Sequence, residues 1–207
     1  IPRKPGMSRS DVLDTNLKII ESLVDAVVHY ANDAMLLLVS NPVDVLTYRA
    51  WQRSGWERQR VFGLSGALDA ARMAAFVAME SGYSAEAVSA MVLGGHGDAM
   101  VPLPKYTCIN GIPIGELLDN ATIERIIQRT RQGGAEILAL KKNSSAYNAP
   151  ASAIVRMVDA INHDRQSIIP SVAILEGEYG EQDIALGVPV VLGKNGAERI
   201  IELSLTS

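Results

Sequence analysis

The stretch at residues 91–102, MVLGGHGDAMVP, determines how the rest of the chain is interpreted. Apolar residues typical of a strand stop at Gly94 and Gly95, and His96 follows immediately. Glycine tolerates positive φ and close backbone approach, so this pattern predicts a strand whose end presents an imidazole to a cleft. A histidine that is merely buried or solvated in a Gly-rich turn is the alternative, and this stretch alone does not decide between them.

The bulk composition is that of an ordinary globular protein. The 207 residues are 48% hydrophobic and 20% charged, with a net charge of −4, which suits one large domain or two small ones. The acidic balance argues against nucleic acid as a partner. The single cysteine, Cys108, cannot form a disulfide within the chain, which favours a reducing, cytoplasmic location. No apolar run reaches the roughly 18 residues of a membrane-spanning helix, so we expect no membrane partner.

Both ends of the chain resemble the middle of a larger protein. Ile1 begins a loop-like stretch without an initiator methionine, and a strand-like run over residues 199–205 is followed by only two more residues. We therefore expect flanking segments on both sides.

The first part of the chain, residues 1–64, has the alternation of an open α/β sheet. Apolar residues recur at helical spacing over 12–27, and a wholly apolar run at 35–39 suits a buried parallel strand. Ligands of such sheets bind beyond the carboxyl ends of the strands, which is where Asn41 lies. The bond from Asn41 to Pro42 is a candidate cis bond, and Pro42 suits the start of the next helix.

The second part, residues 65–207, is expected to be α+β. Apolar periodicity predicts three helices, over residues 65–81, 120–142 and 147–163. Apolar runs separated by Gly-rich turns predict an antiparallel meander, over residues 168–175, 184–192 and 199–205. A hairpin is expected around Asn110 and Gly111, and the long helix is expected to be interrupted or bent near Gly133 and Gly134. The two parts should meet near His96, where a cleft between them would hold a ligand.

Two pairs of charged residues are candidates for a site. Asp69 and Arg72 are three apart on a helix that is apolar nearly all round, and buried charges need a partner or a ligand. A surface ion pair of little value is the alternative. Arg3 and Arg9 lie in a loop that is either solvated or a lid closing on an anionic ligand.

These residue types suit acid–base chemistry on a small dianion. One arginine can grip a carboxylate with two parallel hydrogen bonds, another can answer a second carboxylate, and a third can polarise a carbonyl. A histidine can exchange the proton while an aspartate on its other nitrogen fixes the tautomer. No Cys/His cluster has metal-site spacing, so we expect no metal. Because acid–base groups and anion clamps carry no electrons, a hydride cofactor is expected.

Four motifs resemble the lactate/malate dehydrogenase superfamily, and more closely its lactate-dehydrogenase-like prokaryotic malate dehydrogenases. They occur in the family's order, and the similarity covers nearly the whole chain. The motifs are IPRKPGMSR at residues 1–9, VSNPVD at 39–44, GALDAAR at 66–72 and GGHGDAMVPL at 94–103. The resemblance implies that residues 1–64 are the C-terminal part of a Rossmann-type, parallel-sheet NAD-binding domain, including the active-site loop at 1–10. Residues 65–207 would be the α+β substrate domain without its C-terminal helix.

The resemblance also assigns roles to individual residues. His96 matches the catalytic proton acceptor, and Asp69 matches its orienting partner. Arg72 matches the arginine that binds the C1 carboxylate of the substrate. Arg9 matches the mobile-loop arginine that polarises the reacting carbonyl, and Arg3 matches the position where malate-specific members have arginine.

Three further residues match contacts to the cofactor. Asn41 matches a residue that touches both substrate and nicotinamide, and Val39 and Asn16 match cofactor contacts. By its own pattern, an asparagine beside the apolar stripe of a helix, such as Asn16, is usually at the surface. The family's Gly-rich pyrophosphate loop would precede Ile1, so the expectation of NAD as cofactor rests on the family.

The implied activity is the reversible, NAD-dependent oxidation of (S)-malate to oxaloacetate. The resemblance implies a homo-oligomer, a dimer or tetramer, acting on a small dicarboxylate. An L-lactate or other 2-hydroxy-acid dehydrogenase is the alternative within the same class, and Arg3 argues against it. In a different class, the chain would be a non-catalytic oligomeric fragment that lacks the nucleotide-binding half.

Overall fold

The computed structural model describes residues 9–97, 99–141 and 146–205. The helices in these ranges are α1 (Arg9–Tyr30), α2 (Val43–Ser54), α3 (Gly66–Ser81), α4 (Asn120–Lys141) and α5 (Asn148–Asn162). Short 3-10 turns are η1 (Arg58–Arg60), η2 (Ala85–Ala87), η3 (Pro104–Tyr106), η4 (Ile114–Glu116) and η5 (Glu178–Gly180). The helices predicted over 65–81, 120–142 and 147–163 are confirmed as α3, α4 and α5. None of the described helices combines the length and apolar character needed to cross a membrane.

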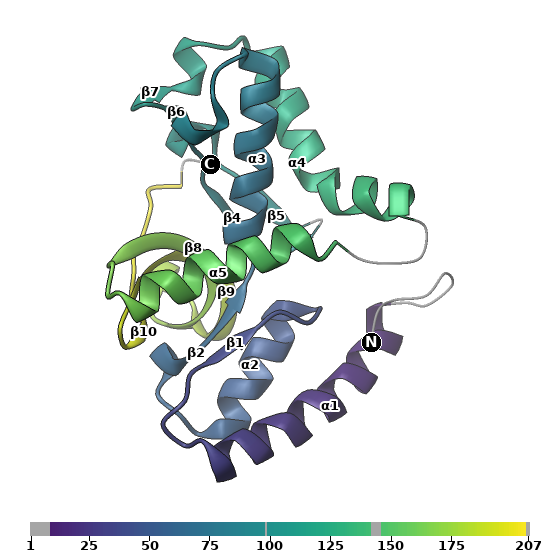
Figure 1. Ribbon diagram of the computed structural model, residues 1–207, viewed down its shortest axis with the longest axis vertical. Helices are drawn as coiled ribbons and strands as arrows, with labels where there is room; N and C mark the ends of the chain where they lie inside the picture. Colours follow the sequence, from purple (N-terminus) through teal and green to yellow (C-terminus); the bar gives the residue numbers. More distant parts are fainter. Residues whose placement is uncertain (1–8, 98, 142–145, 206–207) are drawn as a thin grey trace.

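A five-stranded mixed sheet lies at the centre of the molecule (Figure 1). Its strands, in spatial order, are β1 (Leu36–Leu38), β2 (Val61–Leu64), β8 (Ser167–Glu176), β9 (Gln182–Gly193) and β10 (Gly196–Ile200). β1 and β2 are parallel, whereas β2 with β8, β8 with β9 and β9 with β10 are antiparallel. The parallel strands of the first part and the antiparallel meander of the second therefore share one sheet. The division between residues 64 and 65 stays a prediction, because hydrogen bonding of the sheet continues across it.

The two faces of the sheet are covered by different helices. Along β2, Phe62 points into a core shared with Met157 of α5, whereas Val61 packs in a core with Leu46 of α2 and Val24 of α1. Side chains alternate between the faces of a strand, so neighbouring apolar residues serve two cores. This explains why short, wholly apolar runs form the centre of the fold.

A second group of elements extends beyond the sheet (Figure 1). It comprises α3, α4 and two small antiparallel sheets. One has three strands in the order β3 (Val88–Ser89), β6 (Cys108–Ile109) and β7 (Ile112–Pro113), and the other has two, β4 (Val92–Gly94) and β5 (Met100–Pro102). The predicted hairpin is confirmed: β6 pairs with β7, and Asn110 and Gly111 between them have φ of 49° and 84°. Positive φ at both central residues is what a two-residue hairpin turn requires. α4 is one continuous helix, so the interruption expected near Gly133 and Gly134 is wrong, and the helix changes direction along its length (Figure 1).

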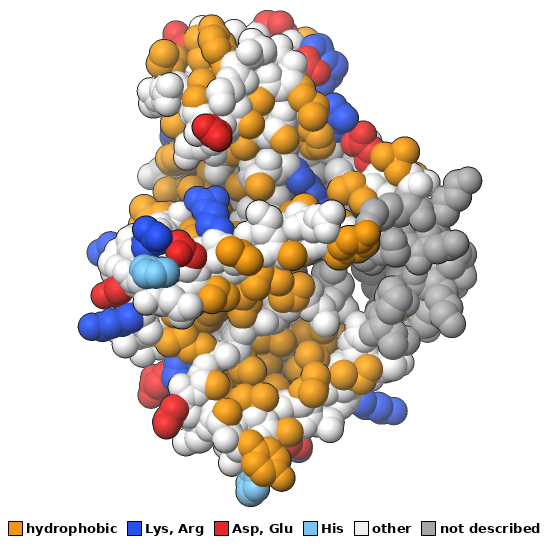
Figure 2. All heavy atoms as spheres, viewed as in Figure 1, with side chains coloured by type: hydrophobic (Ala, Val, Ile, Leu, Met, Phe, Trp, Pro, Cys, Tyr) orange, Lys and Arg blue, Asp and Glu red, His pale blue; other side chains and the backbone are white. Residues whose placement is uncertain are grey.

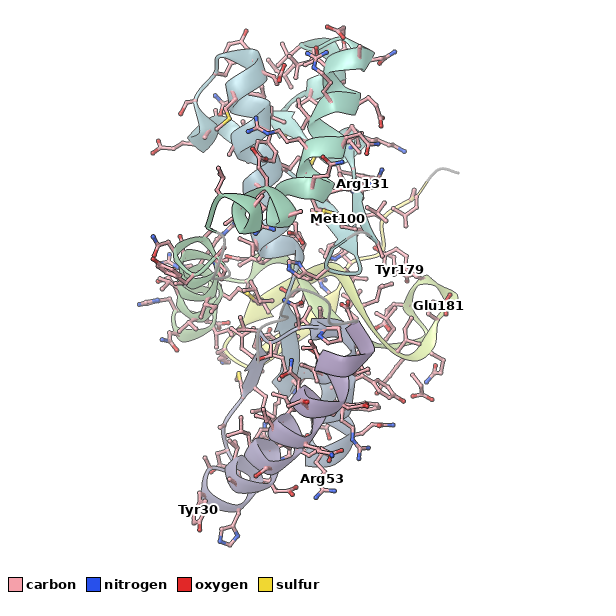
Figure 3. All side chains as sticks on the ribbon, turned by 90° about the vertical axis from the view of Figure 1, so that its right-hand side faces the viewer. Tyr30, Arg53, Met100, Arg131, Tyr179 and Glu181 are labelled. Atoms are coloured by element: carbon pink, nitrogen blue, oxygen red, sulfur yellow. The ribbon has the colours of Figure 1, made fainter. Side chains whose placement is uncertain are left out.

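The strand predicted over residues 199–205 is only partly correct. β10 ends at Ile200. The N–H of Ile201 still donates to the carbonyl of Pro189 in β9 at 2.9 Å, and a side chain holds the main chain beyond it. The Tyr179 hydroxyl donates to the carbonyl of Ile201 at 2.9 Å and accepts the N–H of Leu203 at 3.0 Å. A tyrosine at the tip of the β8–β9 hairpin thus holds this segment in place of a neighbouring strand (Figure 3).

Close packing at the start of α3 fixes that helix against the sheet. A Cβ added to Gly66 would overlap the carbonyl oxygen of Val92 and lie 2.5 Å from Cβ of Pro170. Glycine is therefore required here by contact rather than by φ. In contrast, a Cβ on Gly115 would meet no atom within 4 Å.

Gly66→Ala should lower the free energy of unfolding by about 1–3 kcal/mol, the usual cost of overpacking. Urea unfolding of the two alanine variants measures it, with Gly115→Ala as the matched control that stays near the parent. Equal stability of Gly66→Ala and Gly115→Ala would show that the α3 junction has free space.

An ion pair fastens η1 to the β8–β9 hairpin. The Arg58 guanidinium donates to both oxygens of Glu178, at 2.8 and 3.0 Å, and to the carbonyl of Ile174 at 2.9 Å. This partner lowers the pKa of Glu178 from 4.5 to about 2. The Glu178 side chain is only 19% exposed, so solvent screens the pair less than it would at the surface.

Glu178→Gln should lose about 1–2 kcal/mol of stability at pH 7. The native pKa lies below the unfolded one, so the stabilisation is fully present above about pH 4.5 and is lost as the pH falls towards 2. Urea unfolding at several pH values should show the variant and the parent converging over that window. Glu181→Gln, an exposed position of the same hairpin, is the control (Figure 3). A gap between Glu178→Gln and the parent that is independent of pH would contradict this origin.

Candidate active site

His96 lies in the tight turn that joins β4 to β5. Gly94 and Gly97 have φ of 78° and 118°, and a Cβ on Gly94 would lie 2.7 Å from the carbonyl oxygen of Ala99. Only glycine fits that combination of backbone angle and contact. On the α4 side, Arg131 Nε donates to the carbonyl of Met100 at 3.5 Å, next to the end of this turn (Figure 3). The predicted strand-and-glycine arrangement around His96 is therefore present.

Asp69 links that turn to α3. It lies in the first turn of α3 with a side chain only 1% exposed, and its Oδ2 lies 2.8 Å from Nδ1 of His96. A carboxylate can only accept, so Nδ1 carries the hydrogen and Nε2 is left as the free acceptor of the neutral ring. The His96 side chain is 18% exposed, so the ring is largely but not fully removed from solvent.

The second oxygen of the same carboxylate holds Arg72. Arg72 Nη1 donates to Asp69 Oδ1 at 3.1 Å, and its side chain is 12% exposed. Its Nε is buried and has no hydrogen-bond partner among the described residues. A largely buried guanidinium with one N–H unpartnered suits an anionic ligand. The interpretation of Asp69 and Arg72 as a mere surface ion pair is therefore wrong.

The two glycines of α4 lie against this arginine. A Cβ on Gly133 would lie 3.3 Å from Cδ of Arg72, and one on Gly134 would lie 3.9 Å from its Nη1. They were predicted only to interrupt or bend α4. Their absent side chains also leave room for the Arg72 side chain between α3 and α4.

Val39, Asn41 and Asn16 lie together at the carboxyl end of β1. Val39 and Asn41 are exposed there, and the bond from Asn41 to Pro42 is cis, as the sequence suggested. Asn16 is 4% exposed, so the surface position that its sequence pattern predicts is wrong for this residue. The reason is a hydrogen bond of 2.8 Å from Asn16 Nδ2 to the carbonyl of Asn41, which draws the amide inward from α1.

The two loop arginines cannot be placed with the rest of the site. Arg3 lies outside the described residues, and so does the side chain of Arg9, whose backbone begins α1. Their roles as specificity and carbonyl-polarising residues, and the lid itself, stay predictions.

Sequence reasoning missed Asp44, which precedes His96 by 52 residues. It lies in the first turn of α2, and its Oδ2 accepts the main-chain N–H of His96 at 3.4 Å. Burial raises the pKa of its carboxyl above the ordinary value. The available signal was an acidic residue close after Asn41, at the carboxyl end of β1. Asp44 was noted in the sequence only as part of the VSNPVD motif.

Two sequence profiles of one family cover nearly all of the chain. The profile described as lactate/malate dehydrogenase, NAD binding domain, matches residues 1–63, and that described as lactate/malate dehydrogenase, alpha/beta C-terminal domain, matches residues 66–207. The chain belongs to the lactate/malate dehydrogenase family. The resemblance inferred from the four motifs is confirmed, and the N-terminal residues belong to an NAD-binding domain.

Curated relatives with high identity are named malate dehydrogenase. The malate dehydrogenase of Thioalkalivibrio sulfidiphilus is 66% identical over 205 residues, which are 99% of this chain and 67% of that protein. The malate dehydrogenase of Nitrosococcus oceani is 61% identical over 99% of this chain and 66% of its own length. The chain therefore spans about two thirds of the length of these relatives.

Solved structures of both malate and lactate dehydrogenases share the fold. The malate dehydrogenase from Aeropyrum pernix matches with a TM-score of 0.95 and 42% identity, over all of this chain and 67% of that one. The lactate dehydrogenase from Eimeria maxima with NADH and oxamate also gives 0.95, at 34% identity over all of this chain and 64% of that one. The fold thus identifies the family, but it does not choose between the two substrates.

Proposed function

We propose that the protein containing this chain is an NAD-dependent malate dehydrogenase, which oxidises (S)-malate reversibly to oxaloacetate. The observation that carries the proposal is the single buried carboxylate of Asp69, which binds both His96 and Arg72. It joins a proton-transferring group to an anion-binding group, as a 2-hydroxy-acid substrate requires. Relatives named malate dehydrogenase at up to 66% identity support the choice of substrate.

His96 is the acid–base group in this proposal. In the oxidative direction, Nε2 of the neutral ring takes the proton of the substrate hydroxyl, and in the reductive direction the imidazolium returns it. Asp69 holds Nδ1–H and stabilises the positive charge of the protonated ring. Arg72 binds the carboxylate next to the reacting carbon, with Nε among the donors it has free.

The exposed residues at the carboxyl end of β1 fit the nicotinamide end of NAD. Val39 and Asn41 are open to a ligand, at the sheet edge where α/β folds bind one. When bound, the nicotinamide exchanges a hydride with C2 of the substrate. Asn16 is assigned to the cofactor by the family resemblance, and its bond to the Asn41 carbonyl supports an indirect role, in which it fixes the residue that touches the cofactor.

The remaining assignments complete the proposal. Arg9 polarises the carbonyl oxygen and Arg3 binds the second carboxylate of the dicarboxylate substrate, which distinguishes oxaloacetate from pyruvate. We also propose a cytoplasmic homo-oligomer. Its support is the exposed apolar side chains, which gather over the face that carries α5 in Figure 2 and include Val155 and Val158 of that helix.

The deciding experiment measures NADH oxidation by the whole protein with oxaloacetate and pyruvate in parallel. Rapid turnover with oxaloacetate and little with pyruvate is expected. Arg3→Gln should reduce kcat/KM for oxaloacetate by about thirtyfold or more, the equivalent of the roughly 2 kcal/mol lost with one partner of a charge pair. Preference for pyruvate in the parent would make the protein a lactate dehydrogenase, and no turnover with either would favour a non-catalytic scaffold.

Arg72→Lys tests the carboxylate-binding site directly. Lysine keeps the charge but loses the planar fork, so kcat/KM for oxaloacetate should fall about thirtyfold or more. Arg125→Lys, on a side chain that is 60% exposed in α4, is the matched control and should keep parental kinetics. Parental kcat/KM in Arg72→Lys would remove this residue from the substrate site.

A further inference from the structure

A carboxylate of α2 reaches across to the catalytic turn. Asp44 follows Asn41 by three residues, and its Oδ2 accepts the main-chain N–H of His96 at 3.4 Å. Gly95 precedes that N–H, and even a Cβ there would stay 3.6 Å from Oδ2, so the carboxylate reaches the main chain without an intervening side chain. The contact joins the strand end expected to meet the cofactor to the residue expected to move the proton.

Placing the Asp44 carboxylate in this position costs folding free energy. Its Oδ1 is buried with no hydrogen-bond partner among the described residues. Removal from water raises the pKa of the carboxyl, and the nearby charge of Asp69 raises it further, while the bond from His96 opposes the rise. A native carboxylate with one oxygen buried and unpartnered calls for a specific reason. The hydrogen bond it makes to the His96 main chain supplies one.

His96 is then held from two directions by two different carboxylates. Asp69 of α3 fixes the ring through Nδ1, and Asp44 of α2 fixes the main chain of the same residue. The other charged groups described around this turn are Arg72 of α3, which is neutralised by Asp69, and Arg131 of α4, which donates to the Met100 carbonyl. Of these, Asp44 is the group that ties His96 to α2.

We propose that Asp44 is a positioning residue for His96: its carboxylate fixes the main chain of the catalytic turn relative to the Asn41 end of β1. The inference rests on the proposed function. The hydrogen bond keeps the imidazole at a set distance from a substrate that lies between Arg72 and the cofactor.

The test compares Asp44→Ala and Asp44→Asn in the whole protein, with Asp33→Asn, in an exposed turn, as the control for loss of one negative charge. Asp44→Ala should lower kcat for oxaloacetate reduction at least tenfold while KM for NADH stays within twofold. Asp44→Asn retains an acceptor oxygen and should recover most of that loss.

A readout without turnover separates this inference from the proposed function. Hydrogen exchange of peptides covering residues 92–97, followed by mass spectrometry, should be at least tenfold faster in Asp44→Ala than in the parent and intermediate in Asp44→Asn. If Asp44→Ala does not fold, the exchange of Asp44→Asn relative to the parent decides. The inference is overturned if exchange in the variants matches the parent, or if Asp44→Asn is as impaired as Asp44→Ala. Failure of the parent to reduce oxaloacetate would instead refute the function, with the exchange result unaffected.

Discussion

The arrangement of the site depends on one buried carboxylate that is shared between two partners. Asp69 gives one oxygen to the His96 ring and the other to Arg72, at 2.8 and 3.1 Å. A carboxylate that is 1% exposed would be strongly destabilising alone, so its partners must remain in place whenever the protein is folded. The acid–base group and the anion-binding group are thereby held at a fixed distance before any substrate arrives, which is the preorganisation that catalysis needs.

That carboxylate can be shared only because α3 is packed tightly at its start. Asp69 lies in the first turn of α3, and Gly66, three residues earlier, touches both β4 and β8 with no room for a side chain. The central sheet therefore sets the position of Asp69, and β4 sets that of His96. Backbone contacts between rigid elements set the relative positions of the two residues, and the hydrogen bonds between their side chains complete the arrangement.

The continuous sheet also explains how two parts of the chain cooperate. Asn41 follows β1 and precedes α2, while β8, β9 and β10 extend the same sheet beyond β2 with antiparallel strands. β2 pairs with both kinds of strand, and Gly94 at the end of β4 packs closely against Gly187 of β9. A ligand on the β1 side and the catalytic turn therefore lie against one framework. Asp44 and Asn16 reinforce it with hydrogen bonds that connect α2 and α1 to the site.

The sequence by itself determined the elements, the motifs and the family. Helices, the meander and the 110–111 hairpin follow from apolar periodicity and from glycine and asparagine at positions of positive φ, which are local properties. The His96 turn, Asp69 and Arg72 were found for the same reason, since their residue types and spacing are visible within short stretches. Only the tertiary structure decided that Asn16 is buried, that Asp44 reaches His96 and that the two parts share one sheet. These features depend on partners 25 and 52 residues apart, or on strands from opposite ends of the chain, and no local pattern encodes which distant groups meet.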